Sequence, residues 1–222
     1  AQWLPALQDI GNDFGWRIVN YTKDNCAFHL ADEKLFEREW MHCGQWNRSV
    51  FERIETLNPD AVFLTSTRYR EGDEFTPESY IAAWKTFGDI DIDVIALRDN
   101  PAFDDNVSAC VELHGADEPK CSRQRAEIIK TISPTELLEE PPDNVHFIEL
   151  TDYFCDALTC PPVVGNVLLY RHGNHITATY VRTLRPMLEE EIRRISGRVP
   201  TLTPERLSNG KPVKLAYSKQ SD

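Results

Sequence analysis

The chain has 222 residues, 41% of them hydrophobic, and a formal net charge of −12. This composition suits one globular domain with a single buried core. The acidic excess argues against a nucleic acid partner, because binding to a phosphate backbone needs clustered Lys and Arg. No run of about 18 apolar residues occurs, and the amphipathic N-terminal stretch does not resemble a signal peptide. We therefore expect no membrane span in these residues, with any targeting signal outside them.

Helices and strands are predicted to alternate along the chain. Apolar residues recur at steps of three and four from Trp3 to Phe14, which predicts a helix that Gly15 ends. Short runs rich in β-branched and aromatic residues predict strands. The expected helices cover 3–14, 46–57, 76–88, 122–132 and 177–195. Pro186 allows the last of them to bend. The expected strands cover 16–21, 61–65, 92–99, 144–150 and 166–170.

This alternation predicts a parallel sheet with helices on both faces, the three-layer α/β architecture. Ligands of such sheets bind beyond the carboxyl ends of the strands. The loops that follow the predicted strands are therefore the places where a site is expected. Residues 100–121 are predicted to form one long surface loop. Periodicity is lost after that last helix, and we expect a domain over 1–198 and a C-terminal tail over 199–222.

The six cysteines fall into three consecutive local pairs. Zinc sites bring their ligands in tight doublets, and no pair here has CxxC spacing. A disulfide framework formed in an oxidising compartment is the better interpretation. We predict the disulfides Cys26–Cys43, Cys110–Cys121 and Cys155–Cys160.

The stretch NVLLYRHGNHITATYVRTL places two histidines between a predicted strand and a predicted helix. His172 and His175 could bind a metal, but no nearby His or Cys completes a ligand set once the cysteines pair. We expect neither a metal nor a cofactor. Alternatively, both are ordinary loop residues, and one of them caps the helix that follows. In a third interpretation His175, at the carboxyl end of a strand, is a general base.

Six stretches carry a resemblance to a known family: AQWLPAL, CGQWNRSVFERIETLNPDAVFL, LRDNPAF, CVELHGADEPKC, DYFCDALTC and VVGNVLLYRHGNHITATYVRTL. Because of the order of these stretches and the spacing of their cysteines, the chain from Ala1 to Leu188 resembles the extracytoplasmic SGNH-type domain fused to membrane-bound family-three acyltransferases. Those are bacterial enzymes that O-acylate cell-surface glycans and glycolipids. The resemblance also supports the three predicted disulfides.

Domains of that family resemble GDSL-type esterases, whose nucleophile is a serine after the first strand and whose base is the histidine of a C-terminal DxxH motif. His175 matches that histidine. The resemblance places the oxyanion glycine at Gly44 and the asparagine block at 65–67, where Ser66 stands and no asparagine occurs. Asn47 is a nearby polar alternative, and a helix-capping role is equally open to it.

The chain departs from the family pattern at two points. Family members read GDSHA directly before a stretch like AQWLPAL, and no Gly-Asp-Ser occurs in these residues. We expect the nucleophile and the first core strand to lie upstream of Ala1, because no internal serine, Ser66 included, has the sharp strand-to-helix turn required. The DxxH aspartate is replaced by His172, and a neutral imidazole cannot stabilise an imidazolium by charge. Asp152 is an alternative acid.

Two functions follow from the resemblance. In the first, the domain is part of an O-acyltransferase that receives an acyl group, expected to be acetyl, from a membrane-embedded domain of the same full-length chain. It passes that group through an acyl-serine to a cell-envelope glycan or glycolipid. The domain is then extracytoplasmic and tethered to the membrane, and residues 1–222 by themselves are expected to be inactive. In the second, the domain is catalytically degenerate and only positions the acceptor, which the loss of the DxxH aspartate favours.

Overall fold

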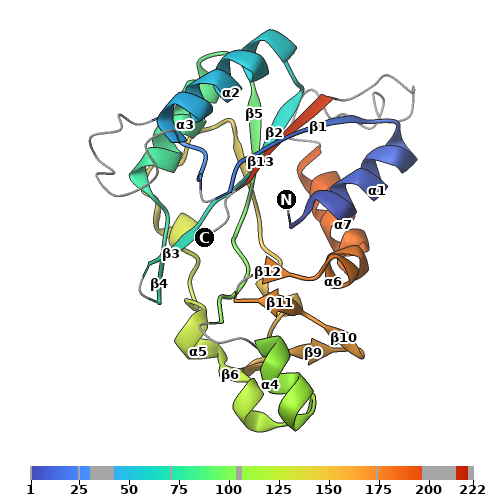
Figure 1. Ribbon diagram of the computed structural model, residues 1–222. Helices are drawn as coiled ribbons and strands as arrows, with labels where there is room; N and C mark the ends of the chain where they lie inside the picture. Colours follow the sequence, from blue (N-terminus) through green and yellow to red (C-terminus); the bar gives the residue numbers. More distant parts are fainter. Residues whose placement is uncertain are drawn as a thin grey trace.

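The computed structural model describes residues 2–24, 26–30, 43–70, 72–103, 107–173, 175–196 and 214–219. Across these ranges the chain forms three layers, with a sheet between two groups of helices (Figure 1). None of the helices in this part of the chain is long and apolar enough to cross a membrane.

The central sheet has five strands in the order β1, β13, β2, β5, β7, and every neighbouring pair is parallel. Four of these strands were predicted from the sequence. Their bounds are β1 (Arg17–Thr22), β2 (Ala61–Thr65), β5 (Asp93–Leu97), β7 (Val145–Ile148) and β13 (Lys214–Lys219). The predicted α/β architecture with a parallel sheet is therefore confirmed.

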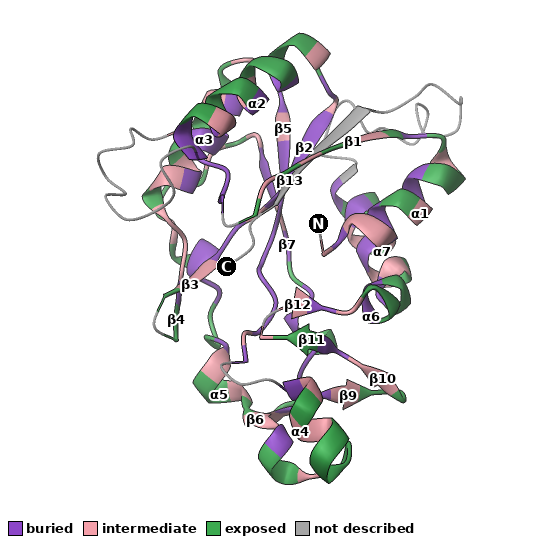
Figure 2. Cartoon of the chain, viewed as in Figure 1, coloured by how far each residue is buried: buried purple, intermediate pink, exposed green. Residues whose placement is uncertain are grey.

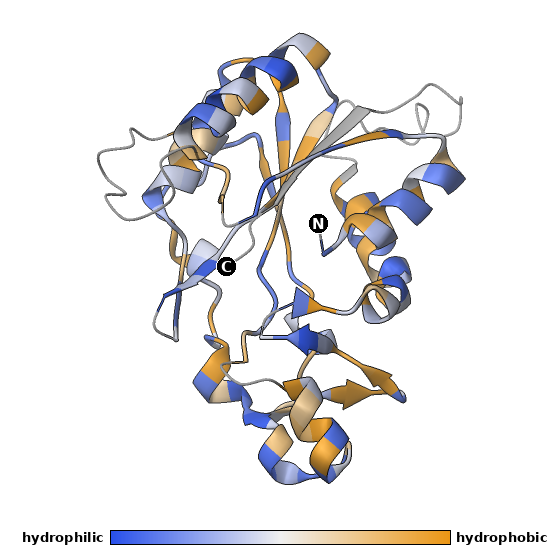
Figure 3. Cartoon of the chain, in the orientation of Figure 1, coloured by the Kyte–Doolittle hydropathy of each residue, from blue (hydrophilic) through white to orange (hydrophobic). Residues whose placement is uncertain are grey.

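Strands β2 and β5 are buried on both faces, which explains their continuous apolar sequences. Val62 and Leu64 of β2 belong to one core cluster, whereas Ala61 and Phe63 belong to the other. Residues two apart on a strand point to the same face, so the run AVFLT supplies both clusters at once. Figures 2 and 3 show these strands as predominantly buried and hydrophobic.

Helices cover both faces of the sheet (Figure 1). On one face lie α1 (Leu4–Phe14), α6 (Ala178–Thr183) and α7 (Arg185–Ser196), and on the other lie α2 (Cys43–Leu57) and α3 (Glu78–Gly88). Gly15 ends α1 in the left-handed conformation with φ of 66°, as predicted. The predicted helix over 177–195 divides into α6 and α7 just before Pro186, because proline has no N–H to continue the ladder.

A smaller unit lies beyond the carboxyl ends of the strands, and we call it the cap (residues 107–130 and 155–176). It consists of short helices and of ladders of two or three residues (Figure 1). Its elements are α4 (Val107–His114), η2 (Pro119–Cys121), β6 (Arg123–Gln124), α5 (Arg125–Ile128), β8 (Thr159–Cys160), β9 (Val163–Val164), β10 (Val167–Leu168), β11 (Tyr170–His172) and β12 (His175–Ile176).

The cap corrects three predictions. The expected loop over 100–121 contains α4, which the periodicity missed because Val107 is its only buried residue. The expected helix over 122–132 shrinks to α5, since the backbone just before it pairs with β8. The expected strand over 166–170 lies outside the central sheet, because β10 pairs with β9 and β11 pairs with β12.

All six cysteines pair as predicted. The Cα atoms lie 5.4 Å apart in Cys26–Cys43, 5.7 Å apart in Cys110–Cys121 and 4.0 Å apart in Cys155–Cys160. The first pair joins the segment after β1 to the start of α2. The other two pairs lie in the cap, where they close loops around α4 and before β8.

The segment predicted as a C-terminal tail contains β13. This strand lies between β1 and β2, with Ala216 opposite both Val19 and Val62. In the sequence KLAYSK only the three residues LAY are apolar, and such a run is too short to predict a strand. Residues 199–213 and 220–222 of the predicted tail lie outside the described residues.

Candidate functional site

The carboxyl ends of all five parallel strands lie at one edge of the sheet, and the cap lies beyond the ends of β5 and β7 (Figure 1). Numbered along the chain, the strand order is 1-5-2-3-4. In open α/β sheets ligands bind beyond the carboxyl ends of the strands.

The two histidines face each other across a short hairpin of the cap. In the β11–β12 ladder His172 is opposite His175, and their ring centroids are 6.3 Å apart. Gly173 begins the turn with φ of 49°, a conformation that favours glycine. His172 is exposed and His175 is half-buried. Of the two, His175 has the more sheltered position that a general base requires.

Three contacts fix this hairpin. The Ile176 N–H donates to Oε1 of Gln2 at 2.6 Å, and Oγ of Ser108 on α4 donates to the Arg171 carbonyl at 3.1 Å. Thr177 caps α6, since its Oγ1 accepts from the Tyr180 N–H at 3.1 Å. Thr177, rather than either histidine, is thus the capping residue.

Two buried polar segments follow β2 and β5 at the same edge. The Ser66 N–H donates to the Leu97 carbonyl at 2.7 Å, which extends the pairing of the two strands. The Asp99 N–H donates to Oγ1 of Thr67 at 3.0 Å, and the Asn100 N–H donates to Oδ1 of Asp99 at 3.0 Å. These contacts hold the start of the loop after β5 in a defined conformation.

Arg98 lies at the centre of a buried ionic network. Its Nε and Nη2 donate to the two carboxylate oxygens of Glu74 at 2.8 and 2.6 Å, and its Nη1 donates to Glu149 at 2.9 Å. Nη2 also donates to the Lys130 carbonyl at 2.6 Å. Burial by itself would lower the pKa of Arg98, but the hydrogen bonds to both carboxylates outweigh it and raise that pKa. The network joins the hairpin of β3 (Arg68–Arg70) and β4 (Asp73–Phe75) to the sheet and the cap.

Two tyrosine hydroxyls are enclosed near this edge. The hydroxyl oxygens of Tyr69 and Tyr170 are buried and have no hydrogen-bond partner among the described residues. Burial is the main cause that raises the pKa of each, and the negative charge of Asp99 adds to it in both cases. Tyr170 belongs to the β11–β12 hairpin, so Asp99 and the hairpin share one poorly solvated environment.

The predicted oxyanion residues lie at separate positions in the fold. Gly44 and Asn47 are buried in the first turn of α2, and Nδ2 of Asn47 donates to the Ala27 carbonyl at 2.8 Å. Asn47 therefore fixes the segment beside Cys26. The Ser66 N–H is engaged with β5, so only the Ser66 hydroxyl could contribute to an oxyanion hole.

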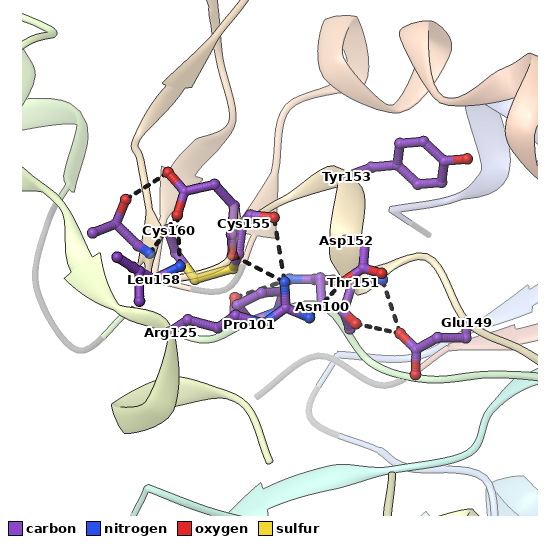
Figure 4. The surroundings of a disulfide bond; sticks show 12 residues. Asn100, Pro101, Arg125, Glu149, Thr151, Asp152, Tyr153, Cys155, Leu158 and Cys160 are labelled. Atoms are coloured by element: carbon purple, nitrogen blue, oxygen red, sulfur yellow. Dashed lines mark hydrogen bonds and ion pairs between the residues drawn. A yellow bond between two sulfur atoms is a disulfide. The ribbon is translucent and has the colours of Figure 1, made fainter. Parts of the chain in front are cut away.

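Asp152, the alternative acid, is engaged elsewhere. It lies in η4 (Thr151–Tyr153), its side chain is 79% exposed, and it forms an ion pair with Arg125 (Figure 4). Arg125 also donates to the carbonyls of Cys155 and Asp156, next to a disulfide. Asp152 thus links η4 to Arg125 of the cap.

The sequence reading missed Arg98 and Asp99, which directly follow an apolar strand. Two charged residues at the carboxyl end of a buried strand were the available signal. Within the described ranges, no group of three or more His, Cys, Asp or Glu side chains is placed to hold a metal ion.

Residues 1–190 match the family model described as the SGNH domain fused to AT3 (acyltransferase 3) domains. No curated protein and no solved structure matches the chain. The matched stretch includes α1, four of the five sheet strands and the whole cap with its two histidines. The chain therefore belongs to the family of SGNH domains that are fused to AT3 domains.

Proposed function

We propose that this domain is the esterase-like part of an O-acyltransferase, with His175 as its general base. Family membership associates the chain with acyltransferases. The observation that carries the proposal is the contact between Gln2 and the Ile176 N–H at 2.6 Å. It brings the beginning of the described chain against the residue next to His175.

This contact supports a position for the expected nucleophile near the hairpin. From the family resemblance we expect Gly-Asp-Ser directly before the stretch that begins at Ala1. One residue of extended chain spans at most about 3.6 Å, so a serine a few residues before Gln2 stays close to the hairpin. The serine and His175 would then meet at the carboxyl edge of the sheet, where doubly wound proteins bind their ligands.

The chemistry is an acyl transfer in two steps. The serine oxygen attacks the carbonyl carbon of the acyl donor while His175 takes the serine proton. The tetrahedral intermediate collapses, the donor's leaving group receives that proton from His175, and an acyl-serine remains. An acceptor hydroxyl then gives its proton to His175 and attacks the acyl carbon, and the serine leaves and is reprotonated. Backbone N–H groups near Gly44 are the proposed oxyanion donors.

The acceptor we propose is a hydroxyl of a cell-envelope glycan or glycolipid, and the acyl group is acetyl. A membrane-embedded AT3 domain in the same chain is the proposed source of the acyl group, which the family description supports. Three disulfides and no free cysteine favour an oxidising, extracytoplasmic compartment.

A binding module is the second candidate function. It is favoured by His172, which is exposed and stands where the family carries the DxxH aspartate. In that case the domain positions the acceptor for the AT3 domain without forming an acyl-enzyme.

Labelling with a fluorophosphonate separates the two functions. The protein is extended before Ala1 by Gly-Asp-Ser-His-Ala, and the labelled residue is mapped by mass spectrometry. We expect label on the added serine, strong reduction in the variant His175→Ala, and no change in the control His114→Ala, whose histidine lies on α4. Residues 1–222 without the extension should neither be labelled nor hydrolyse p-nitrophenyl acetate. Labelling that is absent, or that persists fully in His175→Ala, would contradict the enzymatic proposal.

A further inference from the structure

The histidine base of the proposed function needs an anion that its own motif does not provide. When His175 accepts a proton, the imidazolium is stabilised by a carboxylate that also fixes the ring orientation. Residue 172 cannot do this, because a histidine stands there and its side chain is exposed. The acid must therefore come from another element that meets the hairpin.

Four carboxylates lie at or near the carboxyl ends of β4, β5 and β7. Three of them hold guanidinium groups: Glu74 and Glu149 bind Arg98, and Asp152 binds Arg125. The Arg98–Glu74 pair is buried and costly to break, which commits Glu74 to its present partner. The side chains of Glu149 and Asp152 are 46% and 79% exposed, so solvent screens their charges. The fourth is Asp99, whose residue is 7% exposed and which directly follows Arg98.

The loop that begins at Asp99 packs on the hairpin. The rings of Phe103 and Tyr170 are 4.6 Å apart between centroids. A Cβ placed on Gly173 would lie 3.6 Å from the Phe103 carbonyl oxygen, so the hairpin turn runs along this loop. In Figure 1 the chain leaving β5 descends to β11 and β12. Asp99 and His175 are thus on two segments in contact.

Asp99 is also held in place. Its N–H is bound by Oγ1 of Thr67 and its Oδ1 accepts the Asn100 N–H, both at 3.0 Å. Its negative charge reaches the hairpin, since it contributes, after burial and two neighbouring tyrosines, to raising the pKa of Tyr170. A carboxylate with a fixed backbone in a poorly solvated environment acts strongly on a nearby imidazole.

We propose that Asp99 is the positioning residue of His175 and supplies the negative charge that the family pattern places at residue 172. This proposal rests on the proposed function for its chemical purpose. Its physical content, a carboxylate beside the imidazole, can be measured without any activity. The acid of the site then comes from the loop after β5, 76 residues before the histidine in the chain.

The other charged groups around the hairpin act in a different direction or from farther away. Arg171 and His172 are exposed on β11, and neither can supply a negative charge to an imidazolium. Glu112 and His114 are exposed at the end of α4 distant from Ser108, which is the α4 residue bound to the hairpin. Arg98 is neutralised by Glu74 and Glu149. Asp99 is therefore the group whose removal should change the titration of His175.

The test is an NMR titration of the histidine rings in the 222-residue protein. An opposite charge within hydrogen-bonding reach shifts a pKa by about 1–3 units. We expect the pKa of His175 to lie above that of the exposed His114, and to fall by at least about 1 unit in Asp99→Asn. The control Asp152→Asn, which removes an exposed carboxylate, should leave it unchanged. Equal effects of Asp99→Asn and Asp152→Asn would overturn the proposal.

Rescue provides the second arm. In His172→Asp/Asp99→Asn the carboxylate returns at the family position, and the pKa of His175 should recover. If Asp99→Asn does not fold, the wild-type value decides: a pKa of His175 at or below that of His114 refutes the role of Asp99. If Asp99→Asn lowers the pKa of His175 as expected but the fluorophosphonate does not label the serine, only the enzymatic function is contradicted. If the serine is labelled but Asp99→Asn leaves the pKa of His175 unchanged, only the positioning role of Asp99 is contradicted.

Discussion

The sheet and the cap contain similar short segments of chain but are stabilised by different means. The sheet strands are four to six residues long, and β2 and β5 bury side chains on both faces. The cap strands have two or three residues, and large apolar side chains such as Leu113 and Leu158 are 75% and 73% exposed. Two of the three disulfides lie in the cap. Covalent links thus take over where apolar burial is small.

This difference bears on function, because the cap carries the histidines. The position of His175 depends on one side-chain contact at Gln2, one at Ser108 and the packing of Tyr170 on Phe103. The sheet edge on one side and the disulfide-bonded cap on the other hold the site residues in defined positions, although β11 and β12 are short. Four predictions test this division, in order of decreasing effect.

Removal of β13 should have the largest effect. A protein ending at residue 196 leaves facing edges of β1 and β2 unpaired in the middle of the sheet. We expect loss of cooperative thermal unfolding, measured by circular dichroism. A protein ending at residue 219 is the control and should unfold like the full chain. An unchanged transition in the shorter protein would mean that 199–222 is a tail, as the sequence alone predicted.

Arg98→Met should destabilise the junction between sheet and cap. It leaves the buried carboxylate of Glu74, which is 1% exposed, without its cation. We expect a loss of about 3–5 kcal/mol in the free energy of unfolding in urea. Asp152→Ala, which breaks the exposed pair with Arg125, is the control and should cost below about 1 kcal/mol. Similar losses in both variants would show that burial does not distinguish the two pairs.

Removal of the cap disulfides should act on the cap. The Cys110–Cys121 pair is separated by 11 residues and the Cys155–Cys160 pair by 5. Because the entropy of the unfolded chain is restricted more by a longer loop, Cys110→Ser/Cys121→Ser should cost about 3 kcal/mol and Cys155→Ser/Cys160→Ser about 2 kcal/mol. Hydrogen exchange should accelerate in α4 and the cap ladders before it does in β2 and β5. If hydrogen exchange accelerates equally in the sheet and in the cap, the disulfides do not act on the cap alone.

The smallest effect concerns alkaline pH. Burial raises the pKa of Tyr180 to about 12, and its hydroxyl donates to the Tyr153 carbonyl between α6 and η4. A raised folded-state pKa gives stability that is complete below the unfolded value, about 10, and is lost as pH rises toward 12. The free energy of unfolding should therefore decline over this window. Tyr180→Phe should make this decline shallower. If the variant and the wild-type protein show the same slope, other tyrosines cause the decline.

Much of the sheet could be predicted because its signals are local. Runs such as AVFLT and DVIAL are continuous and apolar, and consecutive cysteines paired as their spacing suggested. The cap could not be predicted in detail, because α4 buries almost nothing and α5 is shortened by the pairing of β6 with β8. There, partners distant in sequence override local propensity.

The candidate site likewise has a part that could be predicted from the sequence and a part that could not. The histidine pair was visible, since both residues lie within one short stretch between a strand and a helix. The Arg98 network was not visible, because Glu74 and Glu149 lie 24 and 51 residues away along the chain. Asp99 was missed for the same reason. Its neighbours Thr67 and Phe103, and the hairpin itself, come together only in the folded sheet.

The position of β13 has a consequence for the order of folding. Pairing of Arg17 with Lys214 closes a loop that includes nearly the whole chain. The entropy of closing a loop grows with its length, and contacts of high sequence separation slow folding. The centre of this sheet is therefore expected to be its last part to form, after the local units of β2, α3 and β5. During synthesis, the facing edges of β1 and β2 stay open until residues 214–219 have left the ribosome, so aggregation through strand pairing is most dangerous in that interval.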